Sequence, residues 1–303
     1  MGKTEDYFDL CIKNISPRLS ALLYNISPKM KKEIQEIRIR NGLPLSITVK
    51  GTPLFVMFDG QTSYDPVGAY MCSVSDIEET YSLLTNHSVY AHSEEIKEGF
   101  IRLPYGCRAG VSGSFSDSGV VFDISGINIR IAREFIGCAD RIYADYNGGG
   151  LLLLGPPGSG KTTLLRDFIR QLSNIGKRVS VIDTRGEISA SYQGKACYDL
   201  GPNTDVYITG SKAFGIIAAL RTMFPRVIAF DEIGTEDELL GVMDGFNAGV
   251  DILTTAHIGR KEDITSRKVV FNLINSGAVK NVFLLSENIG EPPLKIDIKD
   301  VLI

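Results

Sequence analysis

The second half of the chain alternates between short apolar runs and longer amphipathic segments. The apolar runs are typical of strands buried on both faces, and they occupy residues 151–154, 178–183, 226–231, 251–256 and 281–286. Segments with a helical spacing of apolar positions occupy residues 161–174, 211–224, 235–248 and 262–275. This succession predicts an α/β fold with a mainly parallel sheet and helices on both of its faces. The weak alternation at residues 294–303 predicts an additional edge strand.

The first half has a different pattern, in which short helices precede alternating strands. Helical spacing predicts helices at residues 5–14, 17–24 and 75–86, the last capped by Ser75 with Glu78 three residues later. Alternation predicts an antiparallel meander at residues 36–57 and further strands within 98–115 and 126–134. A connector ending in three glycines follows at residues 137–150. We therefore expect a smaller α+β N-terminal domain, residues 1–136, and an α/β domain, residues 137–303.

The junction between the apolar run at 151–154 and the next helix is rich in glycine. It matches the P-loop pattern G-x-x-x-x-G-K-[ST], with the residues Gly155, Pro156, Pro157, Gly158, Ser159, Gly160, Lys161 and Thr162. Glycine lets such a loop turn its backbone N–H groups toward phosphate oxygens, and the helix that continues with Thr163 presents its positive end there. The lysine of this motif reaches the β- and γ-phosphates, and the threonine hydroxyl binds Mg²⁺. The sequence therefore predicts a site for the phosphate chain of a nucleotide.

Two carboxylates follow a later apolar run, at Asp231 and Glu232. In open parallel sheets, ligands bind at the carboxyl ends of the strands, which is where this pair is expected to lie. A nucleotide hydrolase needs a carboxylate for its metal and a group that orients water. We expect Asp231 to hold Mg²⁺ together with Thr162, and Glu232 to polarise the attacking water.

Two further stretches bring polar side chains to the same predicted edge. Asp183 and Glu187 follow the second apolar run, and we expect them near the γ-phosphate, with an ordinary solvated loop as the alternative. His257 follows the fourth run, directly after Thr254, Thr255 and an alanine. The threonines are candidates for sensing the γ-phosphate. His257 is a candidate nucleotide contact, with a purely structural histidine as the alternative.

Composition narrows the classes of function. Hydrophobic residues make up 44% of the chain and charged residues 22%, which is typical of globular proteins. The formal net charge of −4 disfavours a dedicated nucleic-acid binder. No apolar run approaches the roughly 18 residues of a spanning helix, and the start lacks a signal-peptide pattern. The five scattered cysteines predict reduced thiols in a cytoplasmic protein, so any membrane role is expected to be peripheral or through a partner.

The ordered motifs resemble those of the secretion-type ATPases of type II and type IV systems, within the RecA/AAA+ group. The matching segments are the P-loop and residues 181–187, 219–232 and 254–267. In the third segment those ATPases usually carry Gly-Glu where this chain has Asp231 and Glu232. The resemblance therefore implies a RecA-like P-loop ATPase core, and it leaves open how the water-activating role divides between Glu187 and Glu232.

A closer resemblance is to the stage III sporulation protein AA family of endospore-forming bacteria. It covers most of residues 90–285, through the segments 106–113, 155–166, 183–187 and 230–234. It implies a cytosolic ATPase, a hexameric ring, that acts with membrane proteins of a channel complex between mother cell and forespore. In secretion ATPases, arginines of the N-terminal domain reach the nucleotide. The matching candidates are Arg102, Arg108, Arg130 and Arg133, of which we count Arg108 and Arg133 among the catalytic residues. On spacing alone the alternative is solvated sheet faces, where surface arginines usually lie.

These observations together predict a Mg²⁺-dependent ATP hydrolase. Lys161 neutralises phosphate charge, Thr162 and Asp231 hold Mg²⁺, and Glu232, alone or with Glu187, orients water. Two alternatives stay open. One is a nucleic-acid-associated P-loop motor, which shares the RecA core, although direct nucleic-acid binding is not expected from the charge balance. The other is a nucleotide-gated scaffold with little turnover.

Overall fold

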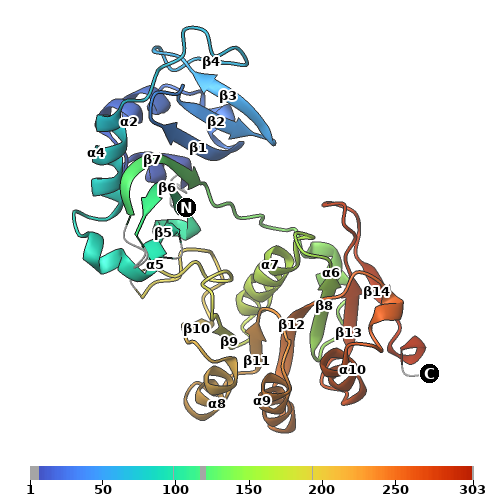
Figure 1. The fold of residues 1–303 in the computed structure, drawn as a ribbon. Helices are drawn as coiled ribbons and strands as arrows, with labels where there is room; N and C mark the ends of the chain where they lie inside the picture. The colour runs from blue at the N-terminus through green and yellow to red at the C-terminus, as the bar shows by residue number, and fades with distance from the viewer. Residues whose placement is uncertain (1–6, 98, 117–120, 193, 302–303) are drawn as a thin grey trace. The chain divides into compact units, whose positions relative to one another are not determined.

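The computed structural model describes residues 7–97, 99–116, 121–192 and 194–301. The chain divides into two compact units, Met1–Arg133 and Glu134–Ile303 (Figure 1). Each unit has its own seven-stranded sheet and its own buried apolar core.

The first unit is built on an antiparallel sheet with the strand order β4-β3-β2-β1-β7-β6-β5. Its strands are β1 Ile34–Arg40, β2 Ser46–Val49, β3 Thr52–Val56, β4 Thr62–Ser63, β5 Phe100–Arg102, β6 Arg108–Phe115 and β7 Val121–Arg130. Its helices are α1 Tyr7–Ile12, α2 Pro17–Tyr24, α3 Pro28–Lys31, α4 Val74–Leu84 and α5 Ser93–Lys97. Ile37 and Ile39 of β1 are both fully buried, because alternate side chains of a strand share one face. Strands β1 to β3 confirm the predicted meander.

The cap of α4 corrects one prediction. Ser73, not Ser75, begins this helix: its hydroxyl accepts a hydrogen bond from the Asp76 amide at 3.2 Å, and the Asp76 carboxylate accepts from the Ser73 amide at 2.8 Å. Asp76 is also buried and accepts from the Tyr70 hydroxyl at 2.9 Å. Both serines have an acidic residue three positions later, so only the tertiary contact with Tyr70 distinguishes them.

The second unit contains a parallel sheet with the strand order β10-β9-β11-β12-β8-β13-β14. Its strands are β8 Leu151–Gly155, β9 Val179–Ile182, β10 Thr204–Tyr207, β11 Val227–Phe230, β12 Asp251–His257, β13 Asn281–Leu284 and β14 Leu294–Ile296. The pairs are parallel except that β14 runs antiparallel to β13 at the edge. The five predicted inner strands and the predicted edge strand are present. Strand β10 was missed, because it has few apolar residues and none of them is fully buried.

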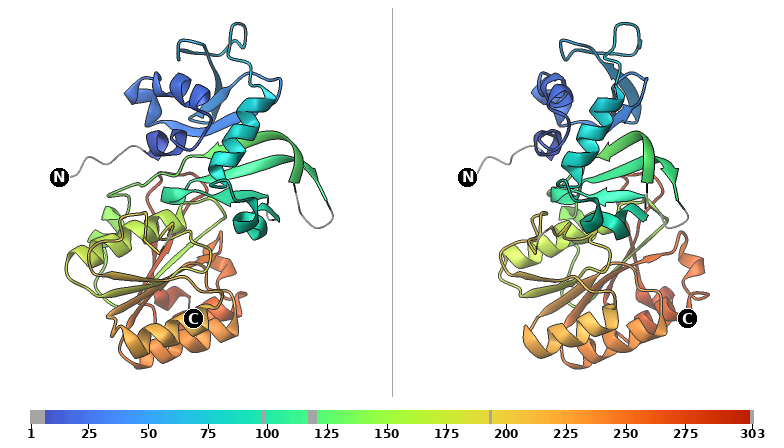
Figure 2. Two further views of the ribbon diagram at one scale, coloured as in Figure 1. Left: turned by 90° about the vertical axis from the view of Figure 1, so that its left-hand side faces the viewer. Right: turned by 60° about the vertical axis from the view of Figure 1, so that its left-hand side comes forward.

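Helices cover both faces of this sheet. They are α6 Asp140–Ala144, α7 Lys161–Asn174, α8 Lys212–Thr222, α9 Glu236–Asn247 and α10 Lys268–Asn275. Helices α6 and α7 pack on one face, and α8, α9 and α10 pack on the other (Figure 2). Neighbouring residues of β8 divide between the two cores, Leu151 and Leu153 into one, Leu152 and Leu154 into the other. This explains why the strand is a continuous apolar run.

Helix α10 is shorter than predicted. Residues Lys261–Asp263 form a 3₁₀ turn, and the α-helix starts at Lys268 rather than near residue 262. The hydroxyl of Ser266 donates to the carbonyl of Asp263 at 2.7 Å, and that of Thr265 donates to the carbonyl of Glu262 at 3.4 Å. Such local side-chain bonds compete with helical ones and keep this segment out of the helix.

Strands β8, β9, β11 and β12 run in the same direction, so their carboxyl ends meet at one edge of the sheet. Strand β12 lies between β8 and β11. Its register places His257 beside Gly155 and Thr254 beside Phe230. The residues that follow β8 and β11 therefore lie on either side of the end of β12.

Candidate functional site

The loop between β8 and α7 is shaped by its glycines. Gly158 and Gly160 have positive φ values of +77° and +90°, which non-glycine residues adopt only with strain. A Cβ on Gly155 would lie 2.6 Å from Ser159 Oγ and 3.0 Å from Leu285 Cβ, so this position has no space for a side chain. Gly160 is also the N-cap of the 14-residue helix α7, whose first N–H groups are available to an anion.

The ammonium group of Lys161 is turned back onto this loop. Nζ donates to the carbonyl oxygens of Gly155 at 2.9 Å and Pro156 at 2.7 Å. Burial lowers the pKa of Lys161, and the carboxylates of Asp231 and Glu232 partly offset this effect. A phosphate group at the loop would offer this buried cation a charged partner in place of a carbonyl oxygen.

Asp231 lies where the P-loop helix meets the end of β11. Thr162 Oγ1 donates to Asp231 Oδ2 at 2.7 Å, and Thr255 Oγ1 donates to Asp231 Oδ1 at 2.5 Å. Thr255 comes from β12 and is fully buried. Both carboxylate oxygens of Asp231 are therefore held in place, and the two residues predicted to hold Mg²⁺ are in direct contact.

The next residue, Glu232, has an uncommon backbone conformation with a φ of +55°. Its amide donates to Thr255 Oγ1 at 3.0 Å, and its carbonyl oxygen accepts a short hydrogen bond from Lys212 Nζ. The backbone of Glu232 is thus held from two sides. This conformation turns the chain at the end of β11.

The carboxylate of Glu232 faces two cationic or donor groups. Arg185 Nη1 lies 3.5 Å and His257 Nε2 lies 3.6 Å from its oxygens. His257 Nδ1 lies 3.1 Å from Lys161 Nζ. An ammonium has only donors, so Nδ1 accepts and the ring proton belongs on Nε2, on the side of Glu232. His257 therefore connects the P-loop lysine to the predicted water-activating glutamate.

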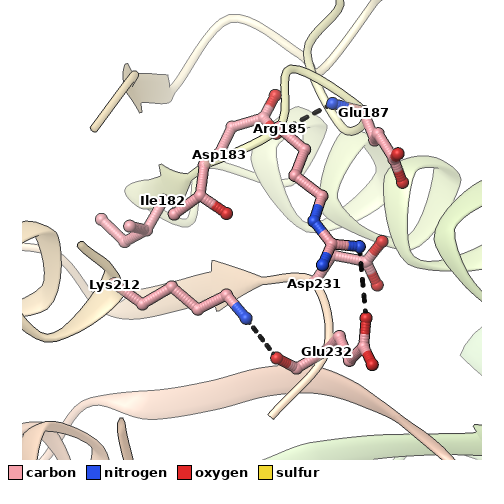
Figure 3. Close-up of a pocket in the computed structure, with 8 residues that line it drawn as sticks. Ile182, Asp183, Arg185, Glu187, Lys212, Asp231 and Glu232 are labelled. Atoms are coloured by element: carbon pink, nitrogen blue, oxygen red, sulfur yellow. Dashed lines mark hydrogen bonds and ion pairs between the residues drawn. The ribbon is translucent and has the colours of Figure 1, made fainter. Parts of the chain in front are cut away.

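A cavity of about 20 Å³ lies beside Glu232 (Figure 3). Its lining consists of Ile182, Asp183, Thr184, Arg185, Glu187, Lys212, Asp231 and Glu232. Its volume suits a single water molecule. The carboxylate of Asp183 stabilises the loop that follows it. It accepts hydrogen bonds from the Glu187 amide at 3.0 Å and from the Ser189 amide and hydroxyl at 2.8 and 2.7 Å.

A larger cavity, about 560 Å³, opens on the other side of the P-loop. One wall is the loop itself with Thr163 and Leu164. The other walls come from Phe135, Cys138, Arg141 and residues 285–286 and 288–293, which include Ile289 and two prolines. This volume and mainly apolar lining are typical of small-ligand sites. Cys138 is exposed as a residue, but partial burial of its thiol, followed by the charge of Asp167, raises the pKa of the thiol to about 11.

The residues at this edge fit a nucleotide with its metal. The Ser159 hydroxyl in the P-loop is buried and has no hydrogen-bond partner among the residues that the structure describes. Native structures rarely leave such a group unpaired, and a phosphate oxygen would satisfy it. Thr162 and Asp231 supply oxygen ligands of the kind that Mg²⁺ prefers.

The second unit brings most of the predicted site residues together. The P-loop, Asp231, Glu232, Glu187 and His257 all lie at one edge of the second unit's sheet. The four arginines belong to the first unit. There, Arg102 and Arg130 make ion pairs with Glu95 and Glu36, Arg108 lies over the ring of Phe100, and Arg133 follows β7 half-buried. Their contact with a nucleotide stays a prediction.

Sequence reasoning missed Lys212 and Arg185. Arg185 lies between Asp183 and Glu187, which were singled out in the sequence for their carboxylates. Lys212 is the first residue of α8, where a cation opposes the helix dipole. That local mismatch is the signal that could have identified it.

The chain matches a known protein family over most of its length. The family model described as "Sporulation stage III, protein AA" matches residues 7–300. The chain belongs to the stage III sporulation protein AA family. It is 32% identical over 271 residues to the Bacillus subtilis (strain 168) protein named "Stage III sporulation protein AA", covering 85% of this chain and 84% of that protein. The predicted family resemblance is confirmed.

Solved structures of ATPases share the fold. The ATPase DotB of Legionella pneumophila superposes with a TM-score of 0.55 and 17% identity, over 83% of this chain and 72% of DotB. The pilus retraction motor PilT with bound ADP superposes with a TM-score of 0.55 and 18% identity, over 86% and 77% of the two chains. At this level of identity the similarity concerns the fold. Among the helices that the structure describes, none has the length and apolar character needed to cross a bilayer.

Proposed function

We propose that this member of the family is a Mg²⁺-dependent ATP hydrolase with a RecA-like core. The observation that carries the proposal is the 2.7 Å contact between Thr162 of the P-loop helix and Asp231 at the end of β11. It joins the predicted phosphate site to the predicted metal carboxylate. Lys161 precedes Thr162 in the chain and Glu232 follows Asp231, and His257 Nδ1 lies 3.1 Å from Lys161 Nζ while its Nε2 lies 3.6 Å from Glu232 Oε1.

Each residue has a role that follows from its chemistry. The loop amides and Lys161 would neutralise phosphate charge in a site where burial strengthens electrostatic interactions. Thr162 and Asp231 would hold Mg²⁺, which supplies further charge stabilisation on the phosphate oxygens. Glu232 would orient and polarise a water molecule in the small cavity beside it, and His257 Nε2–H would keep the carboxylate facing the site.

The larger cavity supports a nucleotide rather than phosphate alone. It adjoins Gly158, Ser159 and Gly160, so a base bound there would continue from phosphates held by the loop. Its apolar lining suits a flat heterocycle, while Ser286, Asn288 and Glu291 supply polar groups at one wall. We assign this cavity to the adenine and ribose.

We also propose that the protein assembles into an oligomeric ring, which family membership and the shared fold with DotB and PilT support. In this ring Arg108 or Arg133, from the first unit of the same or a neighbouring subunit, would complete the nucleotide site. We further propose that the protein acts in the cytoplasm with membrane proteins of a sporulation channel complex. Sedimentation velocity with and without ATP tests the ring, and a strict monomer at all concentrations would count against it.

The direct test of hydrolysis is turnover by the wild type and by Lys161→Ala, with Mg²⁺ present. We expect the variant to lose at least about 10²-fold in rate, the usual cost of removing one preorganised charge-stabilising group. Lys177→Ala is the matched control, because Lys177 is exposed just beyond the other end of the same helix. Undiminished turnover in Lys161→Ala would refute the assignment of the site.

A further inference from the structure

Lys212 is a half-buried cation in an unfavourable place. Its side chain is only 15% exposed, and it occupies the first position of α8, where the helix dipole repels positive charge. Burying a charge is costly unless it is paired and hydrogen-bonded. An exposed polar residue at this position would destabilise the helix less. The contacts of the Lys212 side chain therefore indicate why a lysine is present here.

The first contact is with the carbonyl oxygen of Glu232, which accepts from Lys212 Nζ (Figure 3). Glu232 has a φ of +55°, and a bulky residue keeps such a conformation only when its surroundings over-determine it. Here the amide is fixed by the buried Thr255 hydroxyl at 3.0 Å and the carbonyl by Lys212. Lys212 therefore supplies one of the two bonds that hold this turn.

The second contact is with Glu238, whose Oε1 lies 3.1 Å from Lys212 Nζ. Glu238 is itself fixed, because its Oε2 accepts from the amides of Gly234 at 2.8 Å and Thr235 at 3.1 Å in the capping box of α9. Burial raises the pKa of Glu238, but the hydrogen bonds from the Gly234 amide and Lys212 outweigh it and leave the pKa below its usual value. The Glu238 carboxyl group, which pairs with Lys212, is therefore ionised at neutral pH.

A continuous series of contacts therefore runs from the start of α9 through Glu238 and Lys212 to the backbone of Glu232. We infer that Lys212 is a positioning residue for hydrolysis: it holds the Glu232 turn so that the carboxylate faces the 20 Å³ cavity. It acts through Glu232, and it is not needed for nucleotide binding, which the P-loop provides. This inference rests on the proposed ATPase function.

A role limited to stability would have a different signature. Lys212 and Glu238 also join α8 to α9, so losing them could simply loosen these helices. In that case affinity, rate and melting temperature would fall together. A positioning role lowers kcat while the dissociation constant of the nucleotide and the fold are kept.

The test compares the full-length wild type with Lys212→Met, Glu238→Gln and the double variant. Glutamine at 238 keeps an oxygen that can cap α9 but removes the charge that anchors the lysine. We expect Lys212→Met to lose about 10- to 100-fold in kcat, since small misplacements of reacting groups cost that much. Its dissociation constant for a fluorescent ATP analogue should stay within about twofold, because the P-loop is untouched. The double variant should be no slower than Lys212→Met, because the two side chains act as one unit.

Lys295→Met is the matched control. Lys295 Nζ also donates to a backbone carbonyl, that of Asp145 at 2.6 Å, but at the exposed edge strand β14. It should hydrolyse ATP at the wild-type rate.

Turnover by Lys212→Met within twofold of wild type would overturn the inference while leaving the ATPase proposal intact. A joint fall of affinity, kcat and melting temperature in both Lys212→Met and Glu238→Gln would overturn it in favour of a structural role. A wild type that binds nucleotide but never hydrolyses it would refute the proposed function itself, and the positioning role with it.

Discussion

The buried hydroxyl of Thr255 connects the two carboxylates of the site, and its removal has a calculable effect. In Thr255→Val the side chain keeps its shape but loses both of its hydrogen bonds, the one it donates to Asp231 and the one it accepts from the Glu232 amide. Thr255 is fully buried, so water does not replace the lost hydroxyl directly.

The magnitude follows from the two bonds. A hydrogen bond to a charged group contributes about 1.5–3 kcal/mol and a neutral one about 0.5–1.5 kcal/mol. Thr255→Val should therefore lower the free energy of unfolding by about 2–4.5 kcal/mol. Because Asp231 and the Glu232 turn both lose a fixed partner, Mg²⁺-dependent turnover should fall as well.

The neighbouring Thr254 offers a matched control. It is also fully buried on β12, but within the part of the chain that the structure describes its hydroxyl makes only a long 3.5 Å bond to the carbonyl of Thr255. Thr254→Val should change the free energy of unfolding by less than about 1 kcal/mol. Urea denaturation followed by far-ultraviolet circular dichroism measures both variants, since the chain has no tryptophan to report by fluorescence. Equal losses in the two variants, or a loss below 1 kcal/mol in Thr255→Val, would refute this description of the site.

Three further predictions test separate parts of the second unit. Gly150→Ala should lower the free energy of unfolding by about 3 kcal/mol or more, because its Cβ would lie 2.1 Å from a backbone carbonyl oxygen. Gly210→Ala, whose Cβ would have nothing within 4 Å, should melt like the wild type, and equal melting temperatures of the two variants would contradict this. Burial raises the pKa of Asp167, but hydrogen bonds from a backbone amide and from Arg170 outweigh it and bring the pKa below its usual value. The ionised carboxylate therefore stabilises the fold above about pH 4, and this stabilisation is lost as the pH falls through the folded-state pKa. Asp167→Asn should accordingly be less stable at pH 7, with a difference in unfolding free energy that shrinks below about pH 4, and a difference independent of pH would oppose the assignment. The raised pKa of Cys138, about 11, predicts slow maleimide labelling at pH 7 that Mg²⁺-ATP slows further; labelling indifferent to nucleotide would show that the thiol does not line the nucleotide cavity.

The pattern of the sequence predicted the second unit well because its inner strands are buried on both faces. Such strands appear as plain apolar runs, and β8, β9, β11, β12 and β13 were all found. The edge strand β10 has no fully buried residue, so its four residues carry little apolar signal. The predicted start of the helix at residues 262–275 was wrong for a different reason. The hydroxyls of Thr265 and Ser266 donate to nearby carbonyls, and this segment does not form α-helix.

The sequence predicts only those residues of the candidate site that belong to recognisable motifs. The P-loop, Asp231 and Glu232 carry residue types whose chemistry is recognisable in sequence. The sequence could flag Lys212 as a cation at the start of a helix, but it could not show its partner, because Glu232 lies 20 residues away and accepts with a backbone carbonyl that any residue has. The positive φ of Glu232 is likewise invisible in the sequence, since nothing marks a glutamate as the residue that turns.

Single-turnover hydrolysis of ATP by the full-length wild type and by Glu232→Gln, with Mg²⁺ and excess protein, tests the central proposal most directly. Glutamine keeps the size of the side chain and removes the charge that polarises water. The geometry predicts that both proteins bind ATP, that the wild type cleaves it, and that Glu232→Gln cleaves it at least about 100-fold more slowly. Equal cleavage rates would contradict the role of Glu232, and bound ATP that the wild type leaves intact would show that the protein is a nucleotide-gated scaffold.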